Sequence, residues 1–178
     1  MLEPKNKLVA PGFDTPLELL RACHARISDQ CTTLRKLLQH LKNHSCDVQA
    51  QQAAQAILRY FDTAGKLHHQ DEEMDLFPHL LASGDAEARE LVYRLRNEHR
   101  SMDEVWLFLR QQLVDISKGV SATLDPNTVA RFSLEYGNHI TLENMQLLPL
   151  SAQLLSKQQL AELGEKMASR LRVTLPFN

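Results

Sequence analysis

Residues 129–150, VARFSLEYGNHITLENMQLLPL, decide the fold, because their apolar positions recur in steps of three and four. This spacing lines up one stripe of side chains along a helix, as the seam of a helical bundle requires. Two polar residues, His139 and Glu143, interrupt the stripe. The stretch therefore predicts an amphipathic helix that turns a histidine and a carboxylate toward the core.

The same apolar spacing recurs in three earlier segments, and marker residues show where the helices begin and end. Thr15-Pro16-Leu17-Glu18 is typical of a capping box with proline at the first helical position. Pro78 disfavours continuation of a helix, and Gly119 is a good C-terminal stop. We expect helices over about residues 16–42, 48–77, 86–118, 126–149 and 157–171.

Short connections between helices of this length place sequential helices antiparallel. The sequence therefore predicts an all-α fold, an antiparallel up-down-up-down four-helix bundle over about residues 15–150. A short fifth helix, at about 157–171, should follow it. A chain of 178 residues is enough for one compact core and short for two, so we expect residues 1–178 to form a single domain.

Composition narrows the class of protein and its partners. Lys and Arg total 20 against 22 Asp and Glu, so the chain lacks the net positive charge that favours binding to nucleic acid. No apolar run is long enough to cross a bilayer, and the first residues do not resemble a signal peptide. Three cysteines without a CxxC motif do not predict a disulfide framework or a thiolate metal site. We expect a cytoplasmic protein with neither nucleic-acid nor membrane partners.

Each apolar seam is interrupted by polar residues, and the interruptions should meet. They are His24, His68 with Glu72, His99, and His139 with Glu143. The sequence midpoint between each of these histidines and the next lies at residue 46, between residues 83 and 84, and at residue 119. Each midpoint falls inside an expected turn. Every residue adds the same rise along a helix, so two residues equally far from a turn lie at the same height on the two antiparallel helices that it joins. The four histidines should therefore fall in one layer. Each glutamate lies one turn beyond a histidine on the same face, so the two carboxylates should face each other across the bundle.

Buried carboxylates need compensation. Two unpaired facing carboxylates would cost several kcal/mol each and would favour their neutral forms. Metal cations remove this cost: two glutamates can bridge two ions while four imidazoles supply two nitrogens to each. Such an all-nitrogen-and-oxygen ligand set suits a di-iron or di-manganese centre, and zinc remains an alternative. Each ion would keep open positions for a small ligand such as O₂ or NO.

The remaining polar residues near the seams have ordinary interpretations beside functional ones. A single seam histidine is more often a satisfied core residue than a ligand, and only six groups at matched heights favour metal. We interpret three other histidines as solvated surface residues and place a fourth outside the ligand set: His40, His69, His79 and, fourth, His44. Candidates to orient the ligands or to gate the site are Glu73, Glu98, Asp103 and Tyr136.

These motifs carry a resemblance to a known family. The paired His-x-x-x-Glu motifs, each followed by an apolar-Pro stop, resemble the hemerythrin-like (HHE cation-binding) domain family over about residues 15–150. The stretch 139–144 and the Glu98-His99 pair look most like bacterial di-iron proteins associated with nitrosative stress and iron–sulfur cluster repair. The resemblance implies a non-haem centre of two iron ions with an oxo or hydroxo bridge. Its metal ligands would be His24, His68, Glu72, His99, His139 and Glu143.

Three functional hypotheses stay open at this point. The chain could bind or sense O₂ or NO, or handle iron, at such a centre. It could instead be a di-iron oxidase or peroxidase-like enzyme, or an iron–sulfur cluster repair or iron-donor protein. Finally, it could be a structural bundle with a vestigial site. Oxygen-carrying hemerythrins have a further histidine one turn from the ligand on the third helix, where this chain has Leu95 and Asp103.

Overall fold

The computed structural model describes residues 11–174, and these residues are helical with short connections. The segments are α1 (Pro16–Asn43), α2 (Val48–Tyr60), η1 (Phe61–Gly65), α3 (Lys66–Asp71), η2 (Glu72–Leu76), α4 (Phe77–Ala82), α5 (Ala86–Ser117), α6 (Pro126–Leu142), η3 (Glu143–Leu147), α7 (Leu148–Leu154) and α8 (Lys157–Thr174). The segments labelled η are single wide π-helical turns. No strand occurs between residues 11 and 174, so the all-α class is confirmed.

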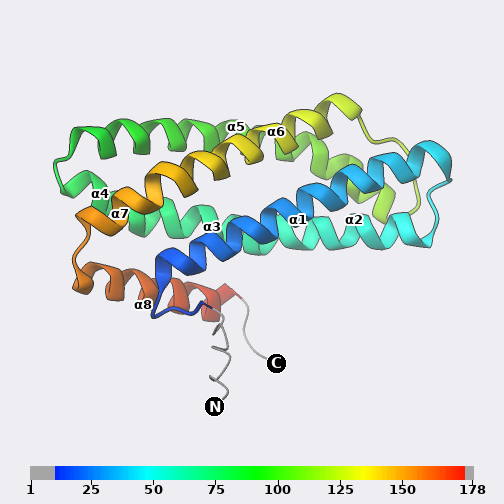
Figure 1. The fold of residues 1–178 in the computed structure, drawn as a ribbon. Coiled ribbons are helices and arrows are strands. Elements are labelled where there is room, and N and C mark those ends of the chain that lie inside the picture. The colour runs from blue at the N-terminus through cyan, green and yellow to red at the C-terminus, as the bar shows by residue number, and fades with distance from the viewer. Residues whose placement is uncertain (1–10, 175–178) are drawn as a thin grey trace, which may run out of the picture.

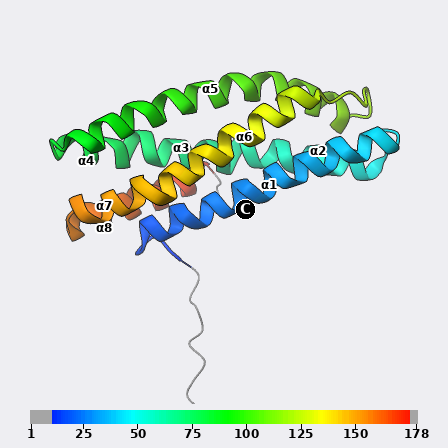
Figure 2. The same cartoon turned by 45° about the horizontal axis from the view of Figure 1, so that its top comes forward.

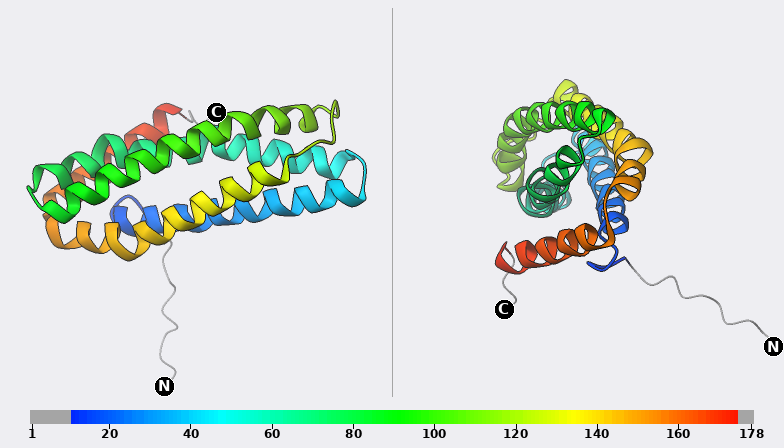
Figure 3. Two further views of the ribbon diagram at one scale, coloured as in Figure 1. Left: turned by 90° about the horizontal axis from the view of Figure 1, so that it is seen from above. Right: turned by 90° about the vertical axis from the view of Figure 1, so that its left-hand side faces the viewer.

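The long helices lie side by side around a common axis. α1 and α5 each pack against both α2 and α6, and α2 runs on through α3 to α4 as α6 runs on to α7. The turns after α1 and α5 lie at one end of the molecule, and the turn between α4 and α5 lies at the other (Figures 1 and 2). α8 packs outside this arrangement against α1, α3 and η2, as the end view in Figure 3 shows.

Most expected helix ends are where the sequence places them. Aspartates cap α2, α5 and α6: Asp47 accepts a hydrogen bond from the backbone N–H of Ala50, and Asp85 and Asp125 act in the same way. Gly119 has φ 70°, the left-handed conformation that lets the chain turn after α5. α1 does begin at Pro16, but the Thr15 side chain makes no cap bond to it and contacts the backbone of Gly12 instead.

Two expected helix ends were wrong. We expected helices to stop at Pro78 and Pro149, but each proline lies in the first turn of a further helical segment, α4 or α7. A wide turn precedes both: the Phe77 N–H donates to the carbonyl of Glu72 across η2, and the Leu148 N–H donates to that of Glu143 across η3. The wider turn changes the hydrogen-bond register just where proline cannot donate, so the helical path continues.

The core consists of two apolar clusters separated by a polar layer. One cluster includes Ile27, and the other includes Leu20. His24 lies between these two on α1 and is only 1 % exposed. His68 and His99 also lie between members of the two clusters along their helices, which places the polar layer between the clusters.

None of the helices between residues 11 and 174 has the length and apolar character that a bilayer crossing requires.

Candidate metal centre

Six ionisable side chains from four long helical runs converge in the polar layer. All six are buried, with exposed fractions between 0 and 2 %: His24, His68, Glu72, His99, His139 and Glu143. They are the six residues that the sequence predicted as ligands. The structure thus brings the whole predicted set together.

The six residues form two groups that share both carboxylates. One group pairs His24 and His68 with the two glutamates, and the other pairs His99 and His139 with the same glutamates. Within each group, one candidate ligand atom per residue lies within 4.8 Å of all the others. Each group could therefore hold a cation, and the two groups adjoin because they share both carboxylates.

Each carboxylate directs one oxygen toward each group. One oxygen of Glu72 is 3.4 Å from His68 Nε2, and its other oxygen is 3.4 Å from His99 Nε2. One oxygen of Glu143 is 3.1 Å from His24 Nε2, and its other oxygen is 3.2 Å from His139 Nε2. Each carboxylate could therefore contribute an oxygen to a cation held in either group.

The fit to a cation is tested by the polar atoms that the protein leaves unpaired. Both carboxylate oxygens of Glu72 and of Glu143 are buried without a hydrogen-bond partner, as is His24 Nε2. Buried polar groups ordinarily have partners, because an unpaired one loses its hydration without compensation. These atoms all face one another, so cations held among them would satisfy them together. The residues present fit a pair of metal ions.

The outer nitrogens of three histidines are held by neighbouring side chains. The Nδ1–H of His99 donates to Glu73 at 2.8 Å, and that of His139 donates to Glu98 at 2.9 Å. The Nδ1–H of His24 donates to the side-chain oxygen of Asn144 at 2.8 Å. Such bonds fix the ring so that Nε2 faces the centre, as in metal-binding histidines.

The sequence had named some of these orienting groups and missed one. Glu73 and Glu98 were among the four candidates, and both contact a ligand histidine. Asn144 was missed, although its place directly after Glu143 was a usable signal. Asp103 and Tyr136 make no hydrogen bond to the six residues in the described part of the chain; they line a neighbouring cavity.

Charges within the centre compensate one another through the histidines. Burial alone would lower the pKa of His24, but the negative charges of the adjacent Glu143 and Glu72 carboxylates raise it to about 10. Burial opposes the same shift at His139, where Glu143 and Glu98 raise the pKa to about 10. The pKa of Glu72 is held well below its usual value against burial, because three histidines surround it. With the protein groups alone, the histidines therefore favour the ionised form of Glu72 rather than the neutral form that we expected.

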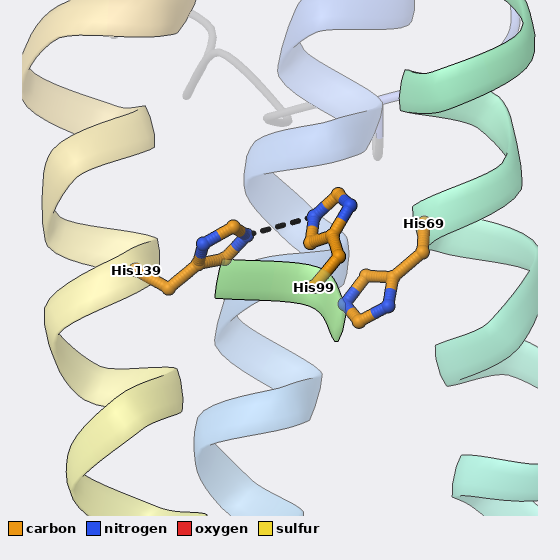
Figure 4. Close-up of side chains that lie close together, drawn as sticks. All are labelled: His69, His99 and His139. Carbon is orange, nitrogen blue, oxygen red and sulfur yellow. Dashed lines mark hydrogen bonds between the residues drawn. The ribbon is translucent and has the colours of Figure 1, made fainter. Parts of the chain in front are cut away.

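His69 is not the solvated surface residue that we expected. Its ring stacks on that of His99 with centroids 4.0 Å apart, and its nitrogens lie near those of His99 and His139 (Figure 4). Burial and the neighbouring His99 lower the pKa of His69 well below its usual value. The periodicity missed this residue, because it follows His68 directly and so lies off the seam of its own helix.

The other histidines lie away from the centre. His40 and His44 stack on each other near the turn after α1, and His40 contacts Asp47 at 3.0 Å. His79 lies on α4. Both His79 and His40 are partly buried, whereas we expected fully solvated surface residues. None of these three belongs to a candidate metal group among residues 11–174.

The fold and the centre define a class of protein, a helical bundle with a buried histidine–carboxylate site for cations. Comparison with known families agrees: residues 15–151 match the model of the hemerythrin HHE cation-binding domain. The match spans most of the chain, so this chain belongs to the hemerythrin HHE cation-binding family. The family resemblance that the sequence motifs carried is thereby confirmed.

The chain also has a relative of nearly the same length. It is 31 % identical over 173 residues to an uncharacterised protein of Haemophilus influenzae, covering 97 % of this chain and 98 % of that protein. The similarity therefore extends beyond the family match, through the segment that forms α8.

Proposed function

We propose that this protein binds two iron ions in a non-haem centre of hemerythrin type and uses them to bind a small diatomic ligand. The ligands would be His24, His68, Glu72, His99, His139 and Glu143. We further propose that residues 1–178 are one domain whose long helices follow an up-down-up-down order. The observation that carries the proposal is the orientation of the two glutamates, each with one oxygen toward each histidine pair.

The chemistry of the donor set favours iron. All six donors are imidazole nitrogens or carboxylate oxygens, and the three cysteines lie outside the candidate groups. Imidazole and carboxylate are both ligands that non-haem iron accepts. Structural zinc sites in proteins are usually closed, tetrahedral and rich in thiolate, unlike this set. Manganese is the nearest competitor, because it accepts the same ligands.

The protein's own groups would prepare the centre for a ligand. Glu73 and Glu98 increase the electron donation of His99 and His139 through their Nδ1–H bonds. The apolar clusters on either side exclude bulk water from the layer. When bound, two iron ions with open coordination positions would bind O₂ or NO reversibly and would donate electrons to the bound ligand.

The test combines metal content with ligand binding. Protein produced with adequate iron should contain two iron ions per chain by elemental analysis and should show charge-transfer absorption of a bridged pair. It should then form a stable, reversible adduct with NO or O₂. Turnover of O₂ or peroxide with a reductant would instead favour the oxidase or peroxidase-like alternative, and transfer of iron to an acceptor would favour the iron-donor alternative. Well-loaded protein without a transition metal would overturn the proposal.

A further inference from the structure

A large cavity lies beside the centre but stops short of it. It measures about 550 Å³ and lies where the wide turn η1 meets α5 and α6. Within residues 11–174, its lining includes His69 and Tyr136 but none of the six predicted ligands. The exposed Leu107 side chain marks its mouth at the surface. A molecule held in this cavity could therefore exchange electrons with the centre without touching an ion.

Aromatic side chains form the walls of the cavity. Trp106 and Phe61 line it with their ring centroids 5.0 Å apart, and Phe132 packs against both. The indole N–H of Trp106 donates to Asp62 at 3.2 Å, and Arg110 also donates to that carboxylate, so the indole ring is held in place. Cavities of this size with aromatic walls and a few polar groups are typical sites for flat organic molecules.

The charges around the cavity favour a molecule without net charge. Asp62 and Arg110 pair with each other at 2.9 Å. The other two charged residues of the lining, Lys66 and Asp103, have opposite signs. A nucleotide with phosphate groups would find no excess of positive charge here, whereas a neutral ring with hydroxyl groups would find both donors and acceptors.

His69 connects the cavity to the centre through stacked rings. The Tyr136 ring lies 5.8 Å from the His69 ring at an angle of 19°. The His99 ring lies 4.0 Å from the His69 ring at 15° (Figure 4). Electrons tunnel readily between aromatic rings in van der Waals contact, whereas atoms cannot pass through them. Because His99 is a predicted ligand, the stack provides a path for electrons from the cavity to the centre.

The Tyr136 hydroxyl is a hydrogen-bonding group in the lining of the cavity. The Tyr136 side chain is 5 % exposed and packs against Phe61 and Phe132, which fix its ring. In the described part of the chain its hydroxyl contacts one polar atom, His69 Nε2, at 3.5 Å. A bond of that length is weak, so the hydroxyl keeps most of its capacity to bond to an oxygen of a bound molecule.

We propose that this cavity binds a neutral hydroquinone and that His69 carries its electrons to the centre. The Tyr136 hydroxyl bonds to one ring oxygen, and Trp106 and Phe61 pack against the ring. The hydroquinone gives up two electrons and two protons and becomes a quinone. One electron goes to each of two ferric ions, which become ferrous, and the protons pass to water at the mouth of the cavity. The inference rests on the proposed function, because an iron pair must receive the electrons.

The first experiment measures binding to chelated protein, so that its result does not depend on metal. Trp106 is the only tryptophan of the chain, and a bound quinone should quench its fluorescence. Duroquinone is the probe, because its fully methylated ring does not add to cysteine thiols. We expect saturable quenching, and about five- to tenfold weaker binding in Tyr136→Phe, the loss expected for one hydrogen bond. Tyr93→Phe, at an exposed position elsewhere on α5, is the matched control and should bind as the wild-type protein does.

The second experiment measures how fast saturating duroquinol reduces the oxidised iron-loaded protein, by stopped-flow absorption spectroscopy. His69→Leu removes the aromatic ring from the path to His99, and His69→Phe keeps a ring there. Both variants should contain two iron ions per chain by elemental analysis. We expect several-fold slower reduction of His69→Leu, whereas His69→Phe should be reduced at close to the wild-type rate. A role of His69 in packing alone would not distinguish the two variants in this way.

The outcomes that would overturn the inference are distinct. Quenching that does not saturate, or equal affinities in Tyr136→Phe and Tyr93→Phe, would remove the hydroquinone site. Equal reduction rates for His69→Leu and the wild-type protein would remove the path through His69. Loss of an iron ion from either His69 variant would make His69 a metal ligand. If His69→Leu does not fold, His69→Gln, which also lacks an aromatic ring, takes its place.

Failure of the proposed function would look different. Wild-type protein that takes up no iron would overturn the iron pair itself, and with it the transfer of electrons. Saturable binding of duroquinone to the chelated protein would then still support the cavity as a hydroquinone site, and absence of that binding would overturn the site as well.

Discussion

Glu72 and Glu143 occupy equivalent places in the two halves of the chain: each begins a π-helical turn, four residues after a buried histidine. Each turn is followed by a helical segment with proline at its second position. The two halves therefore place their carboxylates by the same local device. Wide turns of this kind are frequent at functional sites, where they displace one side chain from the regular helical register.

Removal of a shared carboxylate should affect both metal positions, whereas removal of a histidine should affect one. We expect Glu143→Ala to lose most of both ions, because its two oxygens face different histidine pairs. His68→Ala should retain more metal, because it belongs to one group only. Elemental analysis and circular dichroism check this, with His79→Ala as a control away from the centre. Two ions per chain in Glu143→Ala would show that the ligand list is wrong.

The sequence predicted the convergence of the six residues because two simple rules govern it. Helical periodicity places His99 on the seam of its helix, and equal distances from a turn place His68 and His99 at one height. Neither rule depends on details of packing. Regular helical periodicity does not, however, predict the π-helical turns η2 and η3. Proline normally marks the end of a helix, and the wide turn that precedes it here has no simple sequence signature.

Contacts between helix faces explain what the sequence could not predict about the site. His69 lies off the seam of α3, yet α5 approaches that flank closely enough for the His69 ring to stack on His99. Asn144 reaches back to His24 because η3 rotates the residues that follow Glu143. Both depend on how neighbouring helices are rotated about their axes, which periodicity within one helix does not fix.

The carboxylates that hold the outer histidine nitrogens should tune metal affinity without setting the fold. We expect Glu98→Ala to keep its helical content but to bind metal about 10- to 100-fold more weakly, since His139 loses the acceptor for its Nδ1–H. A competition titration with a chelator measures this. Glu135→Ala is the matched control, because Glu135 pairs with Arg131 and contacts no ligand histidine. Equal affinity in the Glu98 and Glu135 variants would contradict the orienting role.

Chelated and metal-loaded protein should respond to pH in opposite directions. The pKa values of His24 and His139 are raised to about 10, so their contribution to folding is fully present below the ordinary histidine value of about 6.5. It is lost as the pH rises toward 10. The lowered pKa of Glu72 acts in the other direction: its contribution is present above about 4.5 and is lost as the pH falls below that value. Chelated protein should therefore be most stable between about pH 4.5 and 6.5.

Metal-loaded protein should instead lose stability as the pH falls through that same range, because protons compete with the ions for the imidazoles. Thermal unfolding of both forms across pH 4 to 10 provides the comparison. Glu143→Gln is the informative variant, because it removes one charge that raises the pKa of both His24 and His139. Its chelated form should show a weaker decline at alkaline pH. Parallel pH profiles for the chelated and loaded wild-type protein would contradict the arrangement of charges in the centre.

α8 should support the centre from outside through Arg170. Its guanidinium donates to the carboxylates of Asp71 and Asp75, which flank Glu72 along the chain. Asp75 is 5 % exposed, and Lys166 also contacts it at 3.4 Å. We expect Arg170→Ala to lower the free energy of unfolding by about 3 kcal/mol, the lower end of the cost of leaving a buried charge unpaired, because Lys166 remains.

Arg170→Ala should also weaken metal binding, since loss of the Arg170 contacts to Asp71 and Asp75 would disturb the turn that places Glu72. Urea unfolding and chelator competition measure the two effects. Arg172→Ala, on the same helix at an exposed position, is the matched control and should change neither. If Arg170→Ala unfolds and binds metal as the control does, α8 only covers the bundle. A loss of both stability and metal affinity would instead mean that the ion pairs of α8 hold η2, and with it the Glu72 carboxylate, in place.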